Sequence, residues 1–408
     1  MVLDENADLW ANPEWCDWRT RIRGCENSDI WVGYYIIHTI LAYFSGALGL
    51  LVCYKKVYQK VWKNHLSLFE LVEGGIRPRA AETFVVGATI HLFLRAIYTT
   101  VILAGGFGSQ AANESFHELP WHILYSSACL LSVGVIYATP RHRLASNKMR
   151  AVRLPSYTVL NVILFVFCLV PTASLQILAA LTGHARDRNE GYKAKNYNAG
   201  HYGLWSIYCW ALGGVTLYFG ITLIKLLRAS ASPQSSANNI GAGQPKAGSG
   251  GTHSSQTGGD STAADANGRA GFRRAVMTLI VTIGCTFVME AAFGCVLGLF
   301  AALRVQIQSN LGWSVIFATL WIFTTPLMCT PIFLTMLWSL HKSAKEQQMR
   351  FRSTRNGLNS DPFASSRSVA PPLQEPREKW EDVEADRQPT LYARESSTTR
   401  PGARGQMR

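Results

Sequence analysis

The stretch TFVVGATIHLFLRAIYTTVILAG, residues 83–105, decides the fold class of this chain. It is long enough and apolar enough to cross a bilayer as a helix, which takes about 20 residues. Its one formal charge is Arg95, and His91 lies one helical turn before it. An arginine at the centre of a bilayer costs about 2.5–3.5 kcal/mol on insertion scales. We therefore expect Arg95 to have a partner inside the protein.

Six further stretches of the same kind predict a polytopic membrane protein. Of the 408 residues, 48% are hydrophobic and 16% are charged, whereas a soluble protein carries about 25% charged residues. The predicted fold is all-α, a seven-transmembrane helix bundle. Its spans are residues 30–54, 83–105, 119–138, 157–181, 204–227, 275–303 and 313–340. Residues 1–29 lack the apolar segment of a signal peptide, so we expect the first span to direct insertion.

Basic residues predict the orientation, because the inner loops of membrane proteins are enriched in lysine and arginine. With the N-terminus outside, the inner loops 55–82, 139–156 and 228–274 hold six, five and five of them, and the tail from residue 341 holds thirteen. The outer segments hold fewer, although residues 182–203 contain four. The balance predicts an outer N-terminus and an inner C-terminus.

The chain is predicted to have five parts. Residues 228–274 are rich in serine, glycine and alanine without apolar periodicity, which is typical of disorder. The parts are an acidic outer tail (1–29), spans one to five (30–227), a disordered inner loop (228–274), spans six and seven (275–340) and a mostly disordered inner tail (341–408).

Two formal charges lie deep in the predicted spans, Arg95 in the second and Glu290 in the sixth. At about 1.5 Å per residue, they lie about 18 Å and about 22 Å from the inner face. Opposite charges at similar depth, each costly alone, predict an ion pair inside the bundle, which His91 would extend. The pair would act as a structural bolt, as a switch, or as a proton or cation site at Glu290.

Three smaller features concern modification and shape. Cys16 and Cys25 are the two cysteines predicted to lie outside the spans; we expect them to form a disulfide, and two free thiols are the alternative. Asn113 begins an Asn-Glu-Ser glycosylation sequon on the predicted outer side. Pro326 and Pro331 lie in the seventh span, where they would form a hinge or a fixed kink.

Several function classes find no support in the sequence. No GxSxG, HExxH or Walker A pattern occurs, so we expect no enzyme activity. No Cys/His spacing is typical of a metal site, and no cofactor is expected. The net charge of +13 is explained by basic inner loops that meet anionic lipid, so we do not expect nucleic acid to be a partner.

Three segments carry a resemblance to a known family. FLRAIYTTVIL (93–103), LPWHILYSSACLLSVGVIYA (119–138) and LPSYTVLNVILFVF (154–167) are similar to receptor-like seven-span proteins of the tobamovirus multiplication protein family and their animal orphan-receptor relatives. The resemblance implies a GPCR-like fold in the plasma membrane or an endomembrane (vacuolar or lysosomal) and no enzymatic step. The third span ends IYATPRHR instead of carrying the DRY triplet of rhodopsin-like receptors.

We expect a receptor-like protein that signals when spans six and seven shift and change its inner surface. Its partners would be membrane lipids and a G-protein subunit or another cytoplasmic signalling protein. Two alternatives stay open: a proton- or ion-coupled transporter that uses Glu290, and a membrane scaffold that recruits partners without signalling.

Overall fold

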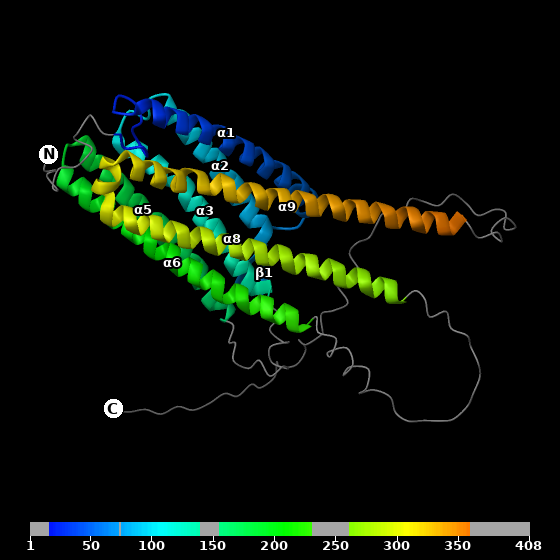
Figure 1. Ribbon diagram of the computed structural model, residues 1–408. Helices are drawn as coiled ribbons and strands as arrows, with labels where there is room; N and C mark the ends of the chain where they lie inside the picture. The colour runs from blue at the N-terminus through cyan, green and yellow to red at the C-terminus, as the bar shows by residue number, and fades with distance from the viewer. Residues whose placement is uncertain (1–15, 73–74, 139–154, 231–260, 360–408) are drawn as a thin grey trace, which may run out of the picture. The chain divides into compact units, whose positions relative to one another are not determined.

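The computed structural model describes residues 16–72, 75–138, 155–230 and 261–359. The chain divides into two units, Met1–Lys345 and Glu346–Arg408, which are described separately. The first unit contains a bundle of long helices (Figure 1). The described residues of the second unit form the last turns of the final helix.

Seven helices in the described residues are long and apolar enough to cross a membrane, which confirms the predicted all-α, seven-helix fold. Large apolar side chains such as Ile40, Phe44 and Phe165 are exposed on their outer faces, as suits a lipid-facing surface. The helices are α1 (Ser28–Val52), α2 (Ala80–Leu103), α3 (Gln110–Ala138), α5 (Tyr157–Asp187), α6 (Gly191–Ser230), α8 (Ser261–Ser309) and α9 (Leu311–Asn359).

Helices meet through short connections at one end of the bundle, which we call the mouth. Residues 104–109 join α2 to α3, residues 188–190 join α5 to α6, and Asn310 joins α8 to α9. The helices alternate in direction, so α1 also begins at this end (Figure 1). The segment just before Ser28 therefore arrives at the mouth.

The opposite end, the base, contains regular structure in residues 55–82, which were predicted to be an inner loop. After α1 the chain continues as a π-helix, η2 (Cys53–Trp62). The strands β1 (Phe69–Val72) and β2 (Gly75–Pro78) then form an antiparallel hairpin in which Phe69 pairs with Pro78. The Oδ1 atom of Asn161 on α5 accepts a hydrogen bond of 3.2 Å from the backbone N–H of Ile76, so the hairpin is tied to the bundle.

The predicted disordered segments fall partly outside the described residues. Residues 231–260 and 360–408 are not described. Residues 261–274, predicted to belong to the disordered loop, are part of α8, and residues 341–359 are part of α9. Both helices thus extend beyond their predicted spans, because hydropathy marks the membrane-crossing part of a helix and not its ends.

Helix α3 lies at the centre of the bundle and α5 at its edge. Of the most apolar window of α3, 78% is buried, against 17% for α5. A Cβ atom at Gly183 of α5 would overlap the backbone of Ala111 in the first turn of α3, so glycine permits this close approach. The contact brings the last turn of α5 against the first turn of α3.

Candidate functional site

The N-terminal segment, residues 16–25, enters the mouth of the bundle, and we call it the plug. A disulfide joins Cys16 to Cys25, with the two Cα atoms 5.2 Å apart. Within the loop, the backbone N–H of Arg21 donates to the carbonyl of Asp17 at 2.7 Å, which closes a tight turn around Trp18 and Arg19. Both of these side chains are fully buried. The predicted outer tail therefore contributes to the core.

Trp18 anchors the plug among three helices. Its ring lies 6.4 Å from that of Trp31 on α1, 6.1 Å from that of Phe300 on α8 and 5.8 Å from that of Trp321 on α9. Burying an aromatic side chain of this kind stabilises a fold by about 1.5–3 kcal/mol. The plug therefore contacts both of the helices that were predicted to move in signalling.

Two tyrosines hold the backbone of the plug. The hydroxyl of Tyr35 on α1 donates to the carbonyl of Trp18, and the hydroxyl of Tyr98 on α2 donates to the carbonyl of Arg19, both at 2.5 Å. Buried carbonyls need such donors, because an unpaired one costs as much as a lost hydrogen bond. The mouth is thus built to receive this turn.

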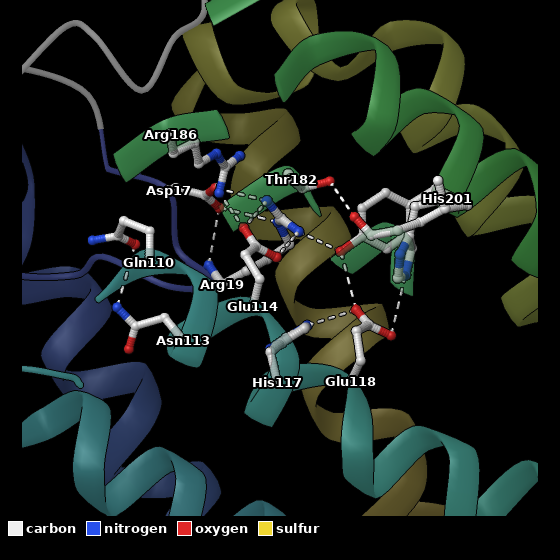
Figure 2. Close-up of polar contacts among 12 residues, drawn as sticks. Asp17, Arg19, Gln110, Asn113, Glu114, His117, Glu118, Thr182, Arg186 and His201 are labelled. Atoms are coloured by element: carbon white, nitrogen blue, oxygen red, sulfur yellow. Dashed lines mark hydrogen bonds and ion pairs between the residues drawn. The ribbon is translucent and has the colours of Figure 1, made fainter. Parts of the chain in front are cut away.

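Arg19 connects the plug to the interior of the bundle (Figure 2). Its guanidinium forms an ion pair with Asp17 at 2.7 Å and a longer one with Glu114 of α3 at 3.5 Å. It donates a hydrogen bond to the hydroxyl of Tyr202 on α6. The guanidinium carbon also lies 5.2 Å from the ring centres of Tyr202 and Phe300, a distance at which cation–π attraction acts.

Two more arginines complete a buried charge cluster, which consists of Asp17, Arg19, Glu114, Arg186 and Arg304. Arg186 at the end of α5 pairs with Glu114 and lies 3.4 Å from Asp17. Arg304 on α8 also lies 3.4 Å from Asp17. Three guanidinium groups thus surround two carboxylates.

The geometry of α8 delivers Arg304 to this place. The helix leaves regular geometry at Leu303, with φ −118° and ψ 23°, so its last turns take a new direction. Arg304 and Gln308, one turn apart, are joined by a hydrogen bond of 3.2 Å. Gln308 also donates to Asp17 at 3.1 Å. Asp17 therefore links the plug directly to α8.

The cluster fixes the ionisation of the plug, which lies outside the membrane-spanning segments. Burial raises the pKa of Asp17, but the charges of Arg19, Arg186 and Arg304 together outweigh burial and hold this pKa well below its usual range. Burial lowers the pKa of Arg19. Asp17, Tyr202 and Glu114 raise it by more than burial lowers it, so the pKa lies well above the ordinary arginine value. Both groups are charged at neutral pH.

Glu118, one turn below Glu114 on α3, is surrounded by aromatic and histidine side chains. It accepts hydrogen bonds from Trp205 at 2.9 Å and from Tyr202 at 3.3 Å. The Nε2 atoms of His201 and His117 lie 3.3 Å and 3.8 Å from its oxygens (Figure 2). Across the part of the chain that is described, no group of three or more His, Cys, Asp or Glu residues is placed to hold a metal ion.

Arg95 connects to this group and not to Glu290. Its Nη1 atom lies 3.4 Å from Nδ1 of His117, which itself neighbours Glu118. Its guanidinium carbon lies 5.1 Å from the ring centre of Trp121. Its Nη2 atom has no hydrogen-bond partner among the described residues.

The predicted ion pair between Arg95 and Glu290 is therefore absent from the described residues, and His91 does not extend one. Nδ1 of His91 lies 2.7 Å from the carbonyl oxygen of Pro120. Glu290 lies instead near Cys209 of α6, which lines the same cavity. Matching depth places two residues in one layer of the bundle, but the facing of each helix decides which of them meet.

Glu290 lines a cavity of about 40 Å³ within the bundle. The side chains around it come from α3, α6, α8 and α9, and include Glu118, Trp121, Tyr125, Trp205, Glu290 and Trp321. Trp121 thus contacts Arg95 and also forms part of this wall. Arg95 and Glu290 therefore belong to two neighbouring groups of side chains, and the indole of Trp121 is part of both.

The structure counts against the predicted glycosylation of Asn113. Its side chain is 3% exposed within the first turn of α3. Its Oδ1 atom accepts from the N–H of Phe107 at 2.8 Å, and its Nδ2 atom donates to Gln110 at 3.3 Å. The amide that would carry a glycan is occupied in holding the turn between α2 and α3.

Pro326 and Pro331 both lie within α9, which continues through them. Ser45 of α1 donates to the carbonyl of Pro326 at 3.5 Å and lies 2.7 Å from the hydroxyl of Thr330. Such hydroxyls satisfy backbone groups near a proline in a membrane helix. The hinge at these prolines stays a prediction.

The charge cluster was not predicted, because every member lies in a segment that the sequence predicts to be a tail or a loop. The third span was drawn from Leu119, whereas α3 begins at Gln110 and so includes Glu114 and Glu118. Arg186 was one of four basic residues in 182–203 that opposed the charge bias. That exception was the available signal, because a buried, paired arginine need not follow the bias of loops.

The sequence matches no protein-family model, no curated protein and no solved structure. What the chain shares with seven-span membrane proteins is therefore its architecture: seven long apolar helices packed as a bundle. The protein is an integral, multi-pass membrane protein.

Proposed function

We propose that this protein is a seven-span receptor, in which contacts at the mouth set the position of α8 and α9. The observation that supports the proposal is the set of contacts between the plug and α8. Asp17 is bonded to Arg304 and Gln308 of α8, and Trp18 packs on Phe300 of α8. These contacts join the plug to one of the two helices that were predicted to move in signalling.

Receptor function requires two states of the bundle that a ligand can favour unequally. The contacts of Asp17 with α8 and of Trp18 with Phe300 and Trp321 would hold α8 and α9 in the observed state. Displacement of the plug would remove these contacts and allow a shift of helices, a common form of switching. With the predicted orientation, the shift would reach a G-protein subunit or another cytoplasmic signalling protein at the base.

The test uses membranes that contain the full chain and a G-protein heterotrimer. Arg304→Gln removes one ion pair of Asp17 but keeps a polar side chain. We expect nucleotide exchange on the G protein to rise about fivefold at equal expression, the lower end of ordinary allosteric coupling. Lys193→Gln is the matched control, because Lys193 is 60% exposed and pairs with Glu190 at its own helix start.

Exchange that equals the level of membranes without the protein, in both the wild type and Arg304→Gln, would overturn G-protein coupling. The fallback for a different signalling partner is affinity capture from membranes, in which Arg304→Gln should change the set of bound cytoplasmic proteins relative to Lys193→Gln. An unchanged set would overturn the proposed role of the plug.

A transporter is the second candidate, because Glu290 lines a cavity inside the bundle. Intramembrane carboxylates mark proton and ion pathways in many transporters. In proteoliposomes, a transporter should carry proton or cation flux that Glu290→Gln abolishes. Flux equal to that of empty liposomes would exclude this candidate.

A further inference from the structure

Glu290 is a buried carboxylate whose partners do not include a cation. Its side chain is 5% exposed, and no ion pair joins it to any described residue. Its neighbour is the thiol of Cys209, a weak donor. Removing a carboxylate from water costs several kcal/mol unless an opposite charge compensates. The missing charge can be supplied by a ligand.

The walls around Glu290 are suited to an organic cation. Trp121, Tyr125, Phe293 and Trp205 line the same cavity, and the rings of Trp121 and Phe293 meet edge to face at 4.9 Å. Aromatic faces attract ammonium groups, most strongly where water is excluded. A carboxylate among such rings is the combination that recognises an alkylammonium.

Two unused donors line the cavity as well. The indole N–H groups of Trp121 and Trp321 have no hydrogen-bond partner among the described residues, although the side chains are only 8% and 2% exposed. Buried indole N–H groups usually find an acceptor. A ligand that carries an oxygen as well as an ammonium group would satisfy them.

The size of the cavity limits the ligand to a few heavy atoms. Its volume of about 40 Å³ equals that of roughly three water molecules by the same measure. Glu118 closes one side, but it is already hydrogen-bonded by Trp205 and Tyr202. Glu290 is therefore the group that would take the ammonium.

We propose that the cavity between α3, α6, α8 and α9 binds a small alkylammonium that also carries an oxygen acceptor, such as ethanolamine, with its ammonium on Glu290. This ligand would belong to the proposed receptor. Any signalling response to the ligand rests on the proposed function, whereas its binding does not. Trp321 also contacts Trp18 of the plug at 5.8 Å, so an occupant would lie one ring away from the plug.

The experiment measures binding to the purified full-length chain in lipid nanodiscs at constant ionic strength, by tryptophan fluorescence and by thermal unfolding. The probes are ethanolamine, ethylene glycol and n-propylammonium, which have the same number of heavy atoms. Ethylene glycol lacks the charge and n-propylammonium lacks the oxygen. Ligands of this size bind with a Kd of about 0.05 mM at best, so titration extends to tens of millimolar.

We expect saturable binding of ethanolamine, binding of n-propylammonium at least about fivefold weaker, and none of ethylene glycol. Glu290→Gln should weaken ethanolamine binding at least tenfold while the protein stays folded, as judged by thermal unfolding. Trp321→Phe keeps a ring but removes one N–H, so it should reduce the preference for ethanolamine over n-propylammonium. Glu82→Gln, on α2 and paired with Lys56 at 3.6 Å, is the matched control and should bind normally.

Three results would overturn the proposal: no saturable ethanolamine binding, equal binding by Glu290→Gln, or equal binding of ethylene glycol, which would show a cavity for water. Binding without any change in nucleotide exchange would support the site and count against the receptor function. Exchange that depends on Arg304, without ethanolamine binding, would support the receptor and overturn this ligand.

Discussion

Carboxyl groups are buried both in the charge cluster at the mouth and at Glu290 in the cavity. Their surroundings differ. At the mouth, Asp17 and Glu114 are buried among three arginines that the protein itself provides. Glu290 is buried to a similar extent, but its polar neighbour is a thiol. Each carboxylate of the first arrangement has a cation of the chain beside it, whereas no ion pair joins Glu290 to any described residue. The difference separates carboxylates that stabilise the fold through ion pairs from one for which we proposed a ligand.

Breaking the charge cluster should have the largest effect. Arg186→Met leaves Glu114 with Arg19 at 3.5 Å as its remaining ion pair and weakens the surroundings of Asp17. Removing one partner of a buried pair costs about 3–5 kcal/mol. We expect a loss of this size in the free energy of unfolding, measured by thermal unfolding in detergent. Arg77→Met is the control, because Arg77 is 42% exposed and 3.9 Å from Glu70, and exposed pairs contribute about 0–1 kcal/mol.

The double variant Arg186→Met with Glu114→Leu sharpens this test. If the cost of Arg186→Met comes from a stranded carboxylate, removing that carboxylate should restore part of the stability. Costs that simply add would show that the two side chains act separately.

Removing the disulfide should have the next largest effect. Cys16 and Cys25 are separated by 9 residues, and closing a loop of this length stabilises a fold by about 2.5 kcal/mol. The double variant to serine should therefore lose about this amount, and the plug should exchange its amide hydrogens faster than α3 does. Hydrogen exchange read by mass spectrometry measures both. Equal protection of the plug in the two proteins would show that Trp18 and Arg19 hold it without the disulfide.

Substitution of Glu290 should change the stability with the opposite sign. Glu290→Gln replaces a buried carboxyl that no arginine or lysine of the described residues pairs with. Burying such a group costs either the desolvation of its charge or the uptake of a proton, so the ligand-free protein should become more stable by about 1–2 kcal/mol. Thermal unfolding in detergent without amines measures this. A loss of stability would contradict the comparison, because it would show that the buried carboxyl contributes favourable interactions within the chain.

The fold could be predicted from the sequence because the bilayer imposes it. Every backbone group inside the membrane must be satisfied within its own helix, so apolar length alone predicted seven helices. The hairpin β1–β2 could not be predicted in this way, because its strands are short and lie beyond the spans, where hydropathy carries little information.

The charge cluster could not be predicted because its pairs join parts of the chain that are far apart. Arg19 and Glu114 are separated by 95 positions, and their meeting depends on the plug turning back into the mouth. The sequence identified Arg95 and Glu290 as deep charges, and both are buried. Their partners depend on helix rotation, which shared depth does not reveal.

The smallest effect concerns pH and isolates the charge of Asp17. The pKa of Asp17 is lower in the folded protein than its ordinary value of 3.8. Its ionisation therefore stabilises the fold fully above that ordinary value, and this contribution is lost as the pH falls toward the folded pKa. Asp17→Asn lacks the contribution at every pH. The difference in unfolding free energy between the two proteins should be constant from about pH 8 to 5 and should shrink by about 1 kcal/mol at about pH 3.

The pH-dependent part of this difference reports the charge of Asp17. A hydrogen bond that is lost in Asp17→Asn changes the unfolding free energy by the same amount at every pH. If the difference stays constant down to about pH 3, folding does not lower the pKa of Asp17, and the three arginines do not act on its charge. If it shrinks as expected, Asp17 retains its charge in acid until the protein unfolds. The plug would then stay seated in an acidic compartment, and displacing it would require a ligand rather than a change of pH.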